Sequence, residues 1–247
     1  MSQINRFLFT SAEELVEAAE QHVATSPADY QQSVRLYFIA RYLVAMFESL
    51  AFRLPIQVWN EYRNALDHFM RYISYPNSET KLNLRRMEGH IQRAVLDMCK
   101  IICFRMNDKL EKQIESDSIP CLRLVEDNFY ERLLNDKRDC LRQLAHAKTV
   151  DHGLGENVGT NMEIVKNYLV PALGMLALWR RYEDNRPSIE KVAQILLEER
   201  RQERRNTIEE SSRKWYSTTN LKNHLFPKLI WTMAGAAIVF LWHAFFH

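Results

Sequence analysis

Apolar residues recur every three or four positions along most of the first 185 residues of this 247-residue chain. This spacing matches the 3.6-residue turn of an α-helix, whereas a half-buried strand needs alternating apolar and polar residues, and no useful stretch alternates. Most of the seven prolines lie at the start of a helical pattern or in the turn before it, where a missing N–H costs least. The sequence therefore predicts an all-α fold, a bundle of five or six amphipathic helices.

The predicted helices span about residues 12–24, 28–53, 56–73, 79–115, 122–148 and 162–182. Thr10 or Ser11 is suited to cap the first helix, and Pro171 is expected to kink the last one. The third and fourth helices carry apolar stripes that predict core positions: Trp59, Tyr62, Phe69, Met87, Ile91, Met98 and Ile102. Residues 152–161 hold three of the six glycines, and because no strand precedes them we interpret them as a flexible loop rather than a phosphate-binding loop.

Composition divides the chain into three predicted segments: a helical domain over 1–185, a charged helical stalk over 186–223 and an apolar anchor over 224–247. In the stalk, blocks of Arg alternate with Glu over residues 196–215, which favours a solvated helix. An Arg-rich surface for RNA or anionic lipid is the alternative, and the interleaved glutamates oppose it.

The last segment reads LIWTMAGAAIVFLWHAFF over residues 229–246 and has no formal charge. Lys222 and Lys228 precede it, and no Lys or Arg follows. This pattern predicts one C-terminal transmembrane helix, with the N-terminal domain in the cytoplasm and the membrane as a partner. A buried helix at the end of a bundle is the alternative interpretation.

Charge and cysteine content exclude several classes of protein. The formal net charge of +2 does not indicate a general nucleic-acid binder. Four cysteines in a chain of this length make no disulfide framework, so free thiols are expected. Cys99 and Cys103 are four residues apart, but no nearby motif completes a metal site. We therefore expect neither a metal nor another cofactor.

The third predicted helix contains Arg63, Asn64 and His68 in the pattern R-N-x-x-x-H. This motif on a strong helix in an all-α chain resembles the HEPN superfamily, helical domains that are often metal-independent endoribonucleases in toxin and antiphage systems. The resemblance implies that Arg63 and His68 are catalytic and that two protomers build one site, so it predicts a homo-oligomer. A histidine can exchange a proton near neutral pH, and an arginine can neutralise charge on phosphate.

The fourth predicted helix has a continuous polar stripe that consists of Asn83, Arg86, His90, Arg93, Asp97 and Lys100. A short turn joins the third and fourth helices, which favours antiparallel packing. In that arrangement Asn64 and His68 lie level with Arg86 and His90, and Arg63 lies level with His90 to Arg93. We interpret Asn64, Arg86, His90 and Arg93 as candidate groups for binding RNA or another phosphate-bearing ligand. The alternative is that both polar stripes face water, with Arg63 paired to Asp67.

Three function classes remain open from the sequence, and the third of them is a purely structural tether. The first is a membrane-anchored HEPN-like ribonuclease, or an RNA- or nucleotide-binding effector, in a defence or stress response. The second is a non-enzymatic membrane effector or adaptor that binds a ligand or partner and is localised or oligomerised by its C-terminal helix. Convergence of Arg63 and His68 on one pocket favours the enzyme, and side chains on separate faces favour the adaptor.

Overall fold

We describe a computed structural model that covers residues 9–50, 53, 55–75, 80–117, 119–153, 162–215, 223 and 226–246. The chain divides into two compact units, residues 1–189 and residues 190–247. The first unit contains the helices that position the candidate site.

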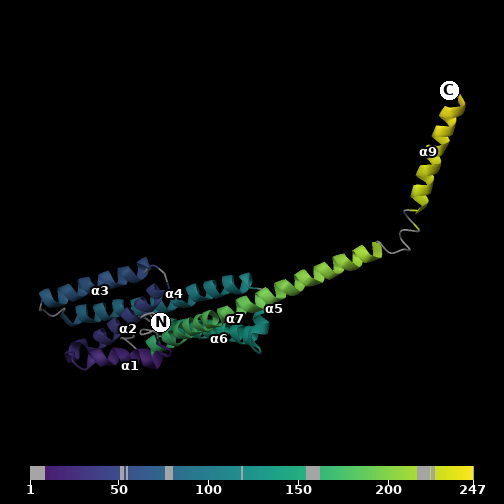
Figure 1. The fold of residues 1–247 in the computed structure, drawn as a ribbon. Helices are drawn as coiled ribbons and strands as arrows, with labels where there is room; N and C mark the ends of the chain where they lie inside the picture. Colours follow the sequence, from purple (N-terminus) through teal and green to yellow (C-terminus); the bar gives the residue numbers. More distant parts are fainter. Residues whose placement is uncertain are drawn as a thin grey trace. The chain divides into compact units, whose positions relative to one another are not determined.

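Every regular element of the described residues is helical (Figure 1). The elements in chain order are α1 Ala12–Val23, the short 3₁₀ helix η2 Ala28–Tyr30, α2 Gln31–Ser49, α3 Ile56–Ser74, α4 Thr80–Ser116, α5 Ile119–Val125, α6 Phe129–Gly153, α7 Met162–Trp215 and α9 Phe226–Phe246. The all-α prediction is therefore confirmed. The N-cap prediction for α1 is also confirmed, because the Ser11 hydroxyl accepts a hydrogen bond from the Glu14 backbone N–H at 3.2 Å.

The helix predicted over residues 122–148 is in fact two helices, α5 and α6. They separate at Asn128, whose φ of 59° lies in the left-handed region. Asparagine adopts this conformation more readily than most residues, so it ends one helix without a glycine. The turn is closed by a backbone hydrogen bond from Phe129 N–H to the Glu126 carbonyl. A polar triplet within a helical pattern hid this break from the spacing analysis.

The helix predicted to end near Tyr182 continues as α7 to Trp215, with Pro171 and Pro187 inside it. The predicted stalk therefore begins within a helix that starts in the bundle, and the two compact units divide at 189/190. Most of the predicted loop 152–161 and most of the end of the stalk, residues 216–222, 224 and 225, lie outside the described residues.

The core of the first unit is formed mainly by α1, α2, α4, α6 and α7, whose apolar side chains form one buried cluster. The predicted core positions on α4 are confirmed, because Met87, Ile91, Met98 and Ile102 are all buried. The prediction for Trp59 is wrong, because 63 % of this residue is exposed. Tyr62 and Phe69 are partly buried against the core.

The exposure of Trp59 follows from the way α3 packs. Only Val58 and Ala65 are buried on this helix. These small side chains let α3 approach α4 closely, so the line of contact runs along them and the large apolar residues lie to one side. The exposed apolar residues on that side are Trp59, Leu66, Met70 and Ile73. We call these four residues the α3 apolar stripe.

The structure corrects the prediction of a C-terminal transmembrane helix and of a single-pass location with a cytoplasmic domain. Among the described residues, none of the helices combines the length and the apolar character needed to cross a bilayer. The cytoplasmic orientation was inferred from the charges beside that span and is withdrawn with it.

A close contact between α6 and α7 provides a stability test. A methyl group added at Gly174 would lie 2.8 Å from the buried Cys140 Sγ, whereas one added at Gly89 in α4 would meet no atom within 4 Å. Both alanine substitutions gain about 1 kcal/mol of helix propensity. Only Gly174→Ala also overpacks its surroundings, which costs about 1–3 kcal/mol. We therefore expect urea unfolding to show Gly174→Ala less stable than Gly89→Ala by about 1–3 kcal/mol. Adding Cys140→Ala to Gly174→Ala should recover part of this difference, and equal stabilities of the two alanine variants would contradict the close contact.

Candidate functional site

The site forms along the seam where α3 and α4 lie side by side in opposite directions. The small residues Val58 and Ala65 bring the helices together, and the polar residues of α3 at positions 61, 64 and 68 follow one flank of that contact line. The polar stripe of α4 runs along the same flank. The polar faces of α3 and α4 therefore meet at a partly buried surface.

Two histidines from different helices stack at the centre of this seam. The rings of His68 and His90 have centroids 5.3 Å apart and planes inclined by 19°. Nδ1 of His68 lies 3.3 Å from Oδ1 of Asn83, a buried residue on α4. Because Oδ1 can only accept, this contact requires Nδ1 of His68 to carry the hydrogen.

The second histidine is held by a carboxylate that it shares with an arginine. Oε2 of Glu61 lies 2.6 Å from Nδ1 of His90 and 3.1 Å from Nε of Arg93. Nη2 of Arg93 is 2.7 Å from Nδ1 of His90, and because a guanidinium can only donate, this contact competes with donation from Nδ1 of His90 to Glu61. Burial by itself would raise the pKa of Glu61, but the hydrogen bonds from His90 and Arg93, together with their charges, lower it. An ionised Glu61 therefore accepts from both neighbours.

This arrangement leaves the outer nitrogen of each ring available. In the tautomer of His90 whose Nδ1–H is donated to Glu61, and with Nδ1–H of His68 donated to Asn83, the Nε2 atom of each neutral ring can accept a proton. Orientation of an imidazole through its Nδ1–H is the arrangement that a general acid or base requires. Arg93 is about half exposed beside them, so its guanidinium can also reach a ligand.

The structure brings His68, His90 and Arg93 together, as the aligned polar stripes predict. Asn64 is partly buried one turn from His68 on the same flank of α3, and Arg86 is exposed one turn from His90 on α4. Among the described residues, neither side chain forms a hydrogen bond or an ion pair. They lie at the solvent side of the seam.

Arg63 does not join these residues. It is exposed and, within the described part of the chain, makes no hydrogen bond or ion pair. Arg63 and His68 are five positions apart, which corresponds to a rotation of roughly 140° around a helix, so the two side chains leave α3 in different directions. Asp67, the alternative partner of Arg63, instead pairs with Arg71 at 3.0 Å. The two motif residues therefore do not converge within one chain.

The sequence analysis missed Glu61 as a member of the site and did not include Asn83 in the predicted cluster. Glu61 precedes Asn64 and His68 by three and seven residues, a helical spacing that places all three on one flank of α3. That spacing is the signal in the sequence that indicates Glu61. Asp97, which lies on the predicted polar stripe of α4, pairs with Lys100 at 3.2 Å.

No metal centre accompanies the site in the part of the chain that the structure describes, where no three His, Cys, Asp or Glu side chains are grouped to hold an ion. Cys99 and Cys103 are buried, and burial raises the pKa of the Cys99 thiol well above its usual value and that of Cys103 to about 12. Both therefore remain protonated thiols at neutral pH, which disfavours metal binding.

Comparison with known proteins gives no family for this chain: protein-family models, curated proteins and solved structures yield no match. The geometry of the site therefore carries the functional argument.

Proposed function

We propose that the α3–α4 seam is the active site of a metal-independent endoribonuclease. The observation that supports this most is the stacked pair of His68 and His90, in which each Nδ1 faces a fixed polar partner. Two imidazoles side by side provide one group to remove a proton and another to donate one. Cleavage of RNA through its 2′-hydroxyl needs both groups.

In the proposed reaction, one neutral histidine takes the proton of the ribose 2′-hydroxyl through Nε2. The 2′-oxygen attacks the adjacent phosphorus, and the bond from phosphorus to the 5′-oxygen breaks. The other histidine, protonated, donates its proton to the departing 5′-oxygen. The products are a 2′,3′-cyclic phosphate and a 5′-hydroxyl, and no oxidant, reductant or metal is consumed.

Arg93 is the group proposed to hold the phosphate. Its planar set of donors suits two phosphate oxygens, and the charge it supplies counters the extra negative charge of the phosphorane. Its Nε is occupied by Glu61, which fixes the guanidinium beside His90. Asn64 and Arg86 flank the seam and are proposed to contact the RNA on either side of the cleaved bond.

The HEPN motif, which Arg63, Asn64 and His68 resemble, is consistent with this reaction except for the identity of the arginine. The motif implies that the arginine is Arg63, whereas the geometry of one chain favours Arg93. A homo-oligomer in which Arg63 serves the site of another protomer would reconcile the two, and the homo-oligomer itself stays a prediction.

The direct test is incubation of the purified full chain with an end-labelled RNA oligonucleotide in EDTA. We expect cleavage with a 2′,3′-cyclic phosphate on the 5′ fragment and a bell-shaped dependence of rate on pH, because one acid and one base are needed. The same oligonucleotide with a 2′-deoxyribose at the cleaved position should be resistant. Binding without cleavage would overturn the enzymatic proposal and favour the adaptor hypothesis.

A matched pair of variants separates the proposed site from a contaminating nuclease. The double variant His68→Ala, His90→Ala should be inactive, whereas His146→Ala, which removes an exposed histidine on α6, should cleave as the wild type does. Equal activity of all three proteins would assign the cleavage to another source.

A further inference from the structure

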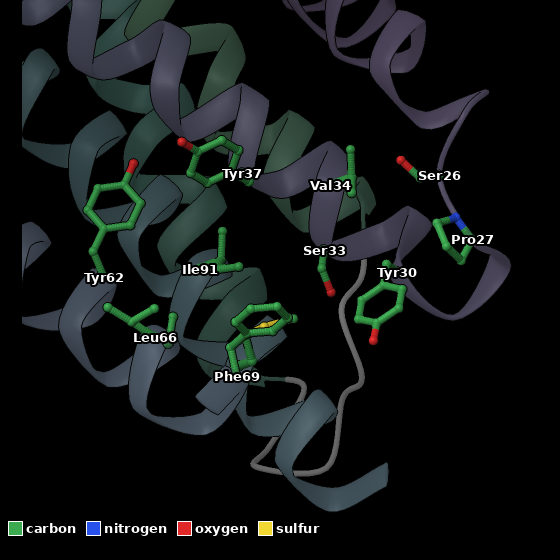
Figure 2. A pocket seen from close by; sticks show the side chains of 12 residues that line it. Ser26, Pro27, Tyr30, Ser33, Val34, Tyr37, Tyr62, Leu66, Phe69 and Ile91 are labelled. Carbon is green, nitrogen blue, oxygen red and sulfur yellow. The ribbon is translucent and has the colours of Figure 1, made fainter. Parts of the chain in front are cut away.

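An apolar cavity lies between α2 and α3, on the flank of α3 opposite to the histidine pair. Its volume is about 540 Å³, within the range of small-molecule sites. The walls come from η2, α2 and α3, and Met87 and Ile91 of α4 also line it. Figure 2 shows the rings of Tyr30, Tyr37, Tyr62 and Phe69 around the cavity. No charged side chain is among its lining residues.

At one end the apolar cavity continues into a second, more polar one. Tyr37 and Tyr62 line both, and their hydroxyl groups lie toward the same end in Figure 2. Arg41 and Glu48 line the second cavity. We call the two adjoining cavities with their shared tyrosines the groove, which is apolar in the first cavity and has its charged residues in the second.

The positions of Arg41 and Glu48 on α2 favour a negatively charged ligand group over a positively charged one. Arg41 follows Tyr37 by one turn, so it is the first charged group beyond the tyrosine hydroxyls. Glu48 lies seven residues further on, roughly 10 Å along the helix. Among the described residues Arg41 has no ion-pair partner, and its guanidinium lies 5.9 Å from the Phe38 ring centroid. An anionic group just outside the apolar part would therefore meet two hydroxyl donors and one cation.

We propose that this groove binds a single-chain amphiphile with a carboxylate head, the chemistry of a fatty acid. The acyl chain occupies the apolar part beside Leu66 and Phe69, and the carboxylate lies at Tyr37, Tyr62 and Arg41. A cationic head at this position would lie beside Arg41, with the nearest carboxylate of the second cavity, Glu48, roughly 10 Å further along α2. A fully apolar molecule gains nothing from the polar groups. This site is separate from the proposed ribonuclease site.

The test is calorimetric titration of the full chain with dodecanoate, and separately with dodecanol. We expect one dodecanoate per chain and an affinity for dodecanol that is lower by about two- to fivefold, the ratio that one exposed charge contact supplies. Arg41→Gln should remove this preference for the carboxylate. Absence of dodecanoate binding, or a preference that persists in Arg41→Gln, would overturn the proposal.

A matched pair of variants on the α3 apolar stripe tests where the acyl chain of the ligand binds. Leu66 and Met70 are 53 % and 49 % exposed, but only Leu66 lines the cavity. Leu66→Gln should weaken dodecanoate binding by tenfold or more, and Met70→Gln should change it by less than twofold. Thermal unfolding followed by circular dichroism checks that both variants fold. Equal losses in the two would indicate adsorption to the exposed stripe and contradict the cavity.

Discussion

His68→Ala and His90→Ala are each expected to lower the rate of RNA cleavage by about 10²–10⁴-fold, the usual contribution of one general acid or base. The two rings are the proposed proton donor and acceptor, so neither replaces the other, and each single loss should approach that of the double variant. Single-turnover cleavage of a labelled oligonucleotide measures the rate. Both side chains are only partly buried, so the variants should retain the wild-type melting temperature to within a few degrees.

The two arginines distinguish a site within one chain from a site shared by two. If Arg93 holds the phosphate, Arg93→Lys should retain part of the activity, because it keeps the charge and loses the planar donors. Arg63→Ala should then cleave at nearly the wild-type rate. A large loss in Arg63→Ala would contradict the single-chain site. Recovery of activity on mixing Arg63→Ala with His68→Ala would then establish a site shared between protomers.

Phe129→Ala is expected to lower the free energy of unfolding by about 3–5 kcal/mol, as for other fully buried aromatic residues. Phe129 begins α6, is fully buried, and has the Arg181 guanidinium of α7 lying 5.6 Å from its ring centroid. Removing the ring leaves a cavity where α6 packs against the core. Urea unfolding followed by far-ultraviolet circular dichroism gives the midpoint and the slope.

Trp59→Ala is the contrasting variant, since it deletes an even larger aromatic side chain from the surface of α3. We expect a change within about 0.5 kcal/mol, as is usual for exposed positions. A loss of several kcal/mol would mean that something covers Trp59 in solution, and would contradict the packing described for α3.

The sequence alone was sufficient to place most of the helices. Spacing of three and four, the Ser11 cap and prolines before helices are local signals, and each acts through neighbouring residues of the chain. For the same reason the bounds of α3 and α4 agree with the predicted ranges to within about a residue. Local signals failed at Asn128, where one left-handed residue divides a helical pattern, and at residues 229–246, where hydropathy suggested a membrane span.

Which side of each helix is buried was decided by tertiary structure. The spacing of α3 marks one broad apolar face, yet the contact with α4 runs along Val58 and Ala65, because small residues permit the closest approach. Because this contact lies to one side of the apolar face, Trp59 is exposed, whereas Glu61 and His68 lie against α4. The sequence could align His68 with His90 along the axes of two helices. Their stacking, and the exclusion of Arg63, depend on how each helix is rotated against its neighbour, which is set by packing between distant parts of the chain.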